Sequence, residues 1–87
     1  MNVRFHSKFI KDVGKLPIDL KQELEQLIQL LETSKSLREI PNVKKLKGGQ
    51  EAYRIRLSGY RVCFYYDRQT IDLARVLLRK DVYKYFP

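Results

Sequence analysis

Arginines stand at mirrored positions on either side of a Ser58–Gly59 pair. A serine–glycine pair between two segments of alternating apolar residues predicts a β-hairpin turn. In a hairpin folded there, Arg56 faces Arg61 and Arg54 faces Cys63, so that three arginines share one face of the sheet. Because a planar guanidinium group donates two parallel hydrogen bonds to phosphate oxygens, this pattern favours binding of a phosphate backbone.

The facing arginines have a cost when no anion is bound. Like charges placed opposite one another on a sheet destabilise it, by an amount on the order of 0.2 to 1 kcal/mol, so folding alone would not favour this arrangement. The alternative is that each arginine pairs with a local carboxylate such as Glu51 or Asp72, in which case the cluster is structural.

Tyrosines and lysines accompany the arginines along the chain. Single-stranded RNA is commonly held by bases that stack on aromatic rings beside cations, so this composition predicts an RNA-binding surface. We expect Tyr66 to be a core residue instead, because it shares a face with Val62 and Phe64. The residues expected to contact RNA are Lys44, Lys45, Lys47, Tyr65, Lys80 and Lys84.

The overall charge points in the same direction. The 87 residues carry a formal net charge of +8, and the sequence pI is about 9.8, so nucleic acid or an acidic protein is the expected partner. The alternative is that the excess lysine only solubilises the surface. With 44% hydrophobic residues, the chain can form a core, and its length fits a single domain over residues 1–87.

Other chemistries find little support in the sequence. Cys63 is the single cysteine and falls in an apolar stretch, so we expect a buried thiol, no disulfide and a reducing cytoplasm. His6 stands apart from other metal-binding residue types, and we expect neither a metal nor a cofactor. Gly48–Gly49, which ends a basic run, lacks the features of a phosphate-binding loop, and no segment is apolar enough for a signal peptide or a membrane span.

Residue periodicity predicts an α+β fold. We expect an N-terminal strand, an amphipathic helix with Ser7 as its N-cap, and a second helix after Pro17 with a leucine stripe facing the core. A loop over 33–42 leads into the basic run 43–47. A three-stranded antiparallel meander follows, twisted and with both helices packed on one face, and the tail 79–87 forms one helical turn. The third strand, 71–78, is nearly all apolar and is expected in a central position.

Four short segments of the chain resemble the RelE/ParE toxin superfamily, and the predicted element order follows that family too. The segments are Lys45-Leu46-Lys47-Gly48, Tyr53-Arg54-Ile55-Arg56, Gly59-Tyr60-Arg61-Val62 and Arg79-Lys80-Asp81-Val82-Tyr83. The resemblance implies the RelE-like microbial RNase fold and the toxin of a type II toxin–antitoxin system. For the RelE branch it implies a ribosome-dependent endoribonuclease that cleaves mRNA without a metal, by attack of the ribose 2′-hydroxyl on the adjacent phosphate.

The same resemblance assigns the site. Arg61 and Arg79 match phosphate-binding arginines of the family, Arg54 and Arg56 fall where basic catalytic residues are frequent, and Tyr83 matches a C-terminal tyrosine. Two departures bear on proton transfer. Arginines replace hairpin lysines, and an arginine cannot lose its proton. Leu78 stands where many relatives have histidine, so Tyr83 or ribosomal RNA is left to move protons, or the activity is weak.

Two other functions remain open on the same fold. One is a ParE-like inhibitor of DNA gyrase, and the other is a non-catalytic module that binds RNA or the ribosome. In each case we expect an acidic antitoxin that covers the basic face, with operator DNA bound only through the antitoxin complex. For the nuclease, the further partners are mRNA on the ribosome and 16S ribosomal RNA.

Overall fold

The sheet is mixed and larger than the predicted meander. In the computed structural model, which describes residues 1–48 and 51–87, five strands follow the order β1–β5–β4–β3–β2. β1 pairs parallel to β5, and the other neighbours are antiparallel. The predicted meander corresponds to β3, β4 and β5, and its antiparallel pairing is confirmed. The strands are β1 (Asn2–Phe5), β2 (Val43–Lys45), β3 (Ala52–Leu57), β4 (Tyr60–Asp67) and β5 (Thr70–Leu78).

The basic run 43–47 contains a strand that the sequence did not reveal. β2 pairs with β3 at the edge of the sheet, with Lys44 opposite Arg54 and Lys45 opposite Tyr53. Three residues are too few to show an alternating pattern, and lysines are common on edge strands because their charge discourages pairing with other chains. The Gly48–Gly49 pair is predicted to end this run, and Gly49 lies outside the described residues.

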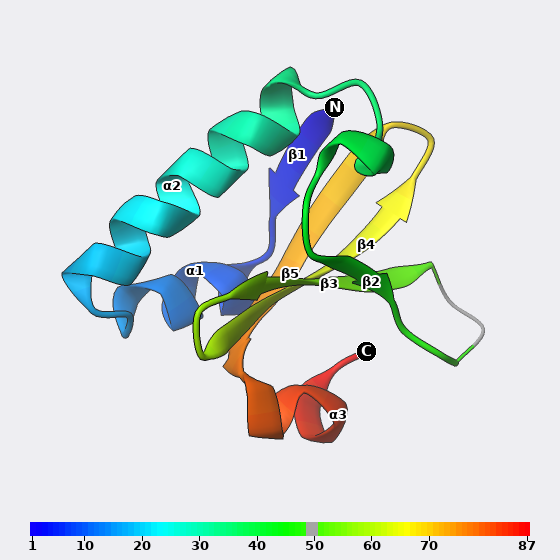
Figure 1. The fold of residues 1–87 in the computed structure, drawn as a ribbon. Helices are drawn as coiled ribbons and strands as arrows, with labels where there is room; N and C mark the ends of the chain where they lie inside the picture. The colour runs from blue at the N-terminus through cyan, green and yellow to red at the C-terminus, as the bar shows by residue number, and fades with distance from the viewer. Residues whose placement is uncertain (49–50) are drawn as a thin grey trace.

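Two helices cover one face of this sheet (Figure 1). They are α1 (Ser7–Gly14) and α2 (Ile18–Thr33). The predicted cap is displaced by one residue, because Ser7 is already helical and His6 occupies the cap position without a side-chain hydrogen bond. The apolar stripes of both helices meet the sheet in the main core, which includes Phe9, Leu24, Leu31, Ile55, Val62, Phe64, Ile71 and Leu73. Tyr66 packs against the same core, which confirms its expected place.

The C-terminal segment covers part of the opposite face. It consists of the 3₁₀ turn η2 (Arg79–Asp81) and the helix α3 (Val82–Tyr85), followed by Phe86, and it lies across the sheet from α2 (Figure 1). Val82 and Phe86 are buried in a smaller apolar cluster with Leu46, Ala52, Cys63, Ala74 and Leu77. The sheet therefore has apolar contacts on both faces, and only part of the second face remains for a site.

A β-bulge shifts the alternation of side chains along β5. Cys63 pairs with Arg75, whereas the next residue, Phe64, pairs with Leu73, so that β5 has one extra residue there. With strict alternation from Leu73, Arg75 would point into the main core. The extra residue lets Val76 take the core position and keeps Arg75 out of it.

In the described part of the chain, no helix is long and apolar enough to cross a membrane.

Candidate functional site

The β3–β4 hairpin brings three arginines to one face of the sheet. Arg56 pairs with Arg61, and Arg54 pairs with Cys63, which confirms the register predicted from the Ser58–Gly59 turn. Ser58 makes the turn with a φ of 55°. Lys44 joins the same face from β2, opposite Arg54. We call the cavity of about 250 Å³ that these residues line, with Asn42 and Val43, the cationic pocket; its residues are Asn42, Val43, Lys44, Arg54, Arg56 and Arg61.

Arg61 is the buried member of the cationic pocket. It is 8% exposed, and its Nη1 atom donates hydrogen bonds to the carbonyl oxygens of Ser58 (3.0 Å) and Tyr60 (2.8 Å). These bonds fix the guanidinium group at the hairpin turn. Burial lowers the pKa of Arg61, and the charges of Arg54, Arg79 and Arg56 lower it further. Arg61 therefore lies close enough to three other arginines for their charges to act on it.

Neither of the two carboxylates considered for these arginines, Glu51 and Asp72, forms an ion pair with them in the described part of the chain. Glu51 forms an ion pair with Lys45, at 3.2 Å, and accepts a hydrogen bond from the Tyr53 hydroxyl, at 3.0 Å. Both bonds lower the pKa of Glu51. Over residues 1–48 and 51–87, the other ion pair within 4.0 Å is Arg75–Asp12, so no described carboxylate pairs with an arginine of the pocket. The structural alternative, in which Glu51 or Asp72 pairs with these arginines, is therefore not what the fold adopts.

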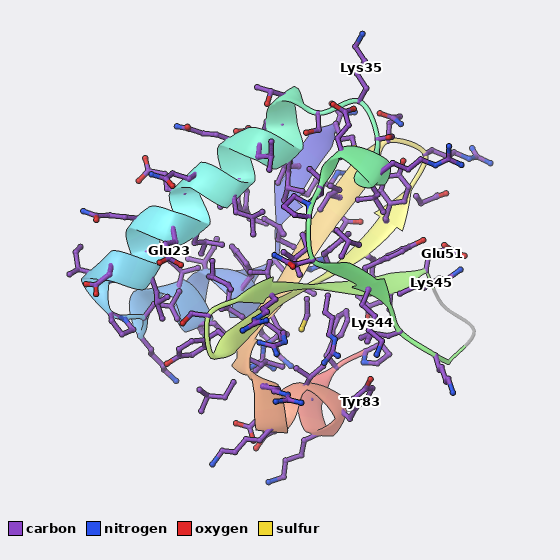
Figure 2. All side chains as sticks on the ribbon, viewed as in Figure 1. Glu23, Lys35, Lys44, Lys45, Glu51 and Tyr83 are labelled. Carbon is purple, nitrogen blue, oxygen red and sulfur yellow. The ribbon has the colours of Figure 1, made fainter. Side chains whose placement is uncertain are left out.

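A second cavity lies beside Arg79. The cavity has about 640 Å³ and is lined by Gly59, Leu78, Arg79, Lys80 and Tyr83. The backbone N–H of Arg79 donates to the Gly59 carbonyl oxygen, at 3.1 Å, which holds η2 against the hairpin turn. Tyr83 extends from α3 (Figure 2). Its side chain is 69% exposed, and that of Leu78 is 40% exposed. Cationic groups and an accessible phenol thus stand next to each other.

The other residues expected to bind RNA lie in varied positions. Lys45 faces the side of Tyr53, opposite to Lys44, and is paired with Glu51 (Figure 2). The Tyr65 ring packs on Phe86 with centroids 5.1 Å apart, in the smaller apolar cluster. The structure therefore leaves these two residues out of the cationic pocket. Lys47, Lys80 and Lys84 are exposed, and Lys84 Nζ lies 5.9 Å from the centre of the Tyr85 ring.

Two residues that the sequence pattern did not indicate, Asn42 and Arg75, lie at the site or beside it. Asn42 lines the cationic pocket in a left-handed conformation, with a φ of 64°. Asparagine just before a strand is a known signal for that conformation, and it could have marked this corner. Arg75 lies on β5 and contacts the C-terminal segment at Tyr85. In the sequence it looks like any strand residue that faces solvent.

Cys63 takes no part in this arrangement as a reactive group. It is fully buried between Arg54 and Arg75 on neighbouring strands, and burial raises the pKa of its thiol to about 12. A thiol with so high a pKa stays protonated at neutral pH and is a poor nucleophile. The expectation of a buried, unreactive cysteine is thus confirmed.

The chain is similar to known proteins in both sequence and fold. No protein-family model matches the chain. It is 36% identical to Toxin RelE3 of Methanocaldococcus jannaschii, over the whole of both chains. The RelB–RelE antitoxin–toxin complex from Methanococcus jannaschii contains a chain with a TM-score of 0.82 and 34% identity, covering 97% of this chain and 99% of that one. The archaeal RelE–RelB complex from Pyrococcus horikoshii gives 0.73 and 26%, covering 93% and 97%.

Proposed function

Because the chain belongs to the RelE family of toxins, we propose that it acts on the ribosome as an endoribonuclease and cleaves mRNA at the cationic pocket. As a RelE toxin it is one half of a type II toxin–antitoxin pair. The observation that carries the nuclease proposal is the buried Arg61, which lies among Arg54, Arg56 and Arg79 with no carboxylate partner among the described residues.

The pocket suits a reaction in which negative charge grows on a phosphate. The 2′-hydroxyl oxygen forms a bond to the adjacent phosphorus, the bond to the 5′-oxygen of the next nucleotide breaks, and a 2′,3′-cyclic phosphate and a 5′-hydroxyl end result. The 2′-hydroxyl proton leaves to a base, and the departing 5′-oxygen takes up a proton. Between these two events the phosphate oxygens carry extra charge, which fixed guanidinium groups stabilise.

The arginines of the pocket supply charge rather than proton transfer. An arginine stays protonated in ordinary protein settings, so Arg54 and Arg56 orient the phosphate and do not act as bases. Tyr83 is exposed, lines the cavity beside Arg79 and carries a phenolic proton, whereas Leu78 in the same cavity has no proton to transfer. We assign Tyr83 the proton transfer, or the stacking of a flanking base, and expect ribosomal RNA to supply the remaining group.

An acidic antitoxin completes the proposal. The two solved structures compared above are complexes of RelE with RelB, and the one from Methanococcus jannaschii is an antitoxin–toxin complex. This chain has a net charge of +8, and four of its cations, Lys44, Arg54, Arg56 and Arg61, line the cationic pocket on one face of the sheet. An acidic segment placed on that face would neutralise the arginines and exclude RNA at the same time.

The test is to map mRNA ends on programmed ribosomes with the purified protein. We expect new 5′-hydroxyl ends with the wild type, and a loss of about 100- to 1000-fold in kcat/KM for Arg61→Ala, the usual cost of one oxyanion donor. Since Arg61 is buried, Arg56→Ala serves as an exposed second variant, and circular dichroism checks that both fold. Arg4→Ala is the matched control, because it removes the same charge from β1 at the opposite edge of the sheet.

Two outcomes would overturn the proposal. Undiminished cleavage by both Arg61→Ala and Arg56→Ala would show that the chemistry lies elsewhere. Arrest of translation with intact mRNA would assign the protein to RNA or ribosome binding without catalysis, which the shortage of proton-transferring groups around the pocket favours as the second candidate.

A further inference from the structure

Arg75 and Asp12 join helix α1 to the free edge of β5. β1 pairs with β5 only as far as Leu73, so the edge beyond it faces α1. There Asp12 Oδ2 accepts hydrogen bonds from Arg75 Nε (2.8 Å) and from the backbone N–H of Val76 (3.0 Å), and Oδ1 accepts from Arg75 Nη2 (3.2 Å). With side chains 12% and 21% exposed, Asp12 and Arg75 form a two-point contact that fixes the plane of the guanidinium group.

The other side of the same guanidinium group faces the C-terminal segment. The carbon atom at its centre lies 5.8 Å from the centre of the Tyr85 ring, within the range of a cation–π contact. Arg75 therefore touches α1 through Asp12 and α3 through Tyr85. The bulge between Cys63 and Phe64 makes this possible, because it turns Arg75 out of the core.

The C-terminal segment needs such a contact to hold its orientation. α3 has four residues, far fewer than an isolated helix requires, and Phe86 N donates to Val82 O at 2.8 Å. Its buried anchors, Val82 and Phe86, lie in the same apolar cluster. These two residues fix how close α3 lies to the sheet. Tyr85 lies outside that cluster, and its contact with Arg75 opposes rotation of α3 about its own axis. The helix fixes the angle between the side chains at positions 83 and 85, so holding Tyr85 also sets the direction of Tyr83.

We propose that Arg75 is a positioning residue: with Asp12 it holds Tyr85, and so orients Tyr83 and Arg79 at the edge of the cationic pocket. The inference rests on the proposed function for its effect on catalysis. Its structural half, the ordering of residues 79–86, stands without that function. Arg75 itself lines neither the cationic pocket nor the cavity beside Arg79.

Amide hydrogen exchange in the RNA-free protein tests the structural half. Tyr85→Leu removes the ring and leaves Asp12 and Arg75 untouched, whereas Tyr85→Phe keeps the ring and is the matched control. We expect exchange over residues 79–86 to become at least threefold faster in Tyr85→Leu and in Arg75→Lys, and unchanged in Tyr85→Phe. Exchange in β3 and β4 should stay as in the wild type. Equal exchange over 79–86 in all four proteins would refute the positioning role, whether or not the protein cleaves RNA.

Kinetics on programmed ribosomes test the catalytic half. We expect kcat to fall about two- to fivefold in Tyr85→Leu and Arg75→Lys, the size expected for one partly exposed cation–π contact, with KM unchanged and wild-type values for Tyr85→Phe. A loss that Tyr85→Phe shares, or a change confined to KM, would contradict positioning. If wild-type protein cleaves nothing, the nuclease proposal fails, while the exchange experiment still decides the role of Arg75.

Discussion

Arg56 and Arg61 are direct partners across the β3–β4 hairpin, and both line the cationic pocket. One is exposed and the other is buried at the turn. The two guanidinium groups repel each other when no anion is bound, and an anion between them makes the arrangement favourable. The facing arginines therefore lower the stability of the free protein while they favour anion binding, and a mutation of Arg56 can separate these two effects.

Replacing Arg56 by glutamine should stabilise the protein and weaken its function. Removing one of two facing charges should raise the free energy of unfolding by about 0.5 kcal/mol at low salt, and by less in 1 M salt, where the repulsion is screened. Urea denaturation at the two salt concentrations measures this difference. Arg4→Gln on β1 controls for the change in net charge. A less stable Arg56→Gln protein would indicate a favourable contact that the structure does not contain.

The salt dependence of RNA binding should show how many cations of the pocket contact phosphate groups. For single strands, log K falls with log of salt concentration by about 0.7 per neutralised phosphate. We expect Arg54→Gln to reduce the slope for a non-cleavable single-stranded RNA by about that amount, and Lys45→Gln to leave it unchanged, since Lys45 is paired with Glu51 on the other face. Fluorescence anisotropy over a salt series provides the slopes. Equal slopes for wild type and Arg54→Gln would remove Arg54 from the RNA contact.

Cys63 should make stability depend on alkaline pH. Its pKa is about 12 in the folded chain and near 9 when exposed, so the unfolded chain loses this proton first. The stabilisation is complete below pH 9 and is lost as the pH rises toward 12, with a slope of at most about 1.4 kcal/mol per pH unit. Cys63→Ala should show a shallower fall over this range, measured by urea denaturation. Rapid alkylation of the native thiol at pH 8 would contradict the buried environment.

Asp12→Asn should destabilise the fold more than other changes of carboxylate to amide. Asp12 accepts three hydrogen bonds, two of them from the charged Arg75, and its side chain is 12% exposed. Hydrogen bonds to charged groups contribute roughly 1.5 to 3 kcal/mol, so we expect a loss of about 2 kcal/mol in the free energy of unfolding. Glu23→Gln on the exposed face of α2 is the control and should change it by less than about 0.5 kcal/mol. Similar losses for both variants would show that the Asp12 contacts add little.

The β4–β5 turn offers a stabilising change away from the site. Arg68 and Gln69 adopt φ values of 45° and 68°, which are unfavourable for residues with side chains of this kind. Asparagine followed by glycine is the preferred pair for a turn with two positive φ values. We expect Arg68→Asn combined with Gln69→Gly to raise the melting temperature by a few degrees, with RNA cleavage unchanged. Calorimetry measures the shift, and a lower melting temperature would mean that the Gln69 hydrogen bond to Tyr66 outweighs the strain.

Much of the site could be predicted because it depends on one local turn. The Ser58–Gly59 pair fixes the pairing of Arg56 with Arg61, and period-two alternation then assigns each side chain to a face. What could not be predicted depends on contacts between distant segments. β2 is too short to show a pattern, and the pairing of Lys45 with Glu51 follows from that strand. Tyr65 looks like an accessible ring until Phe86 packs against it.

The bulge in β5 has a consequence for changes of chain length. The two faces of this strand serve different layers, and the extra residue opposite Cys63 decides which layer receives each later side chain. Deleting Ala74 would shift Val76 and Leu77 by one position, so that each would exchange the main core for the smaller cluster or the reverse. The C-terminal segment would also start from the wrong side of the sheet. A change in the number of residues in β5 therefore disturbs both layers of the fold, whereas a change of one residue type affects only the layer that its side chain faces.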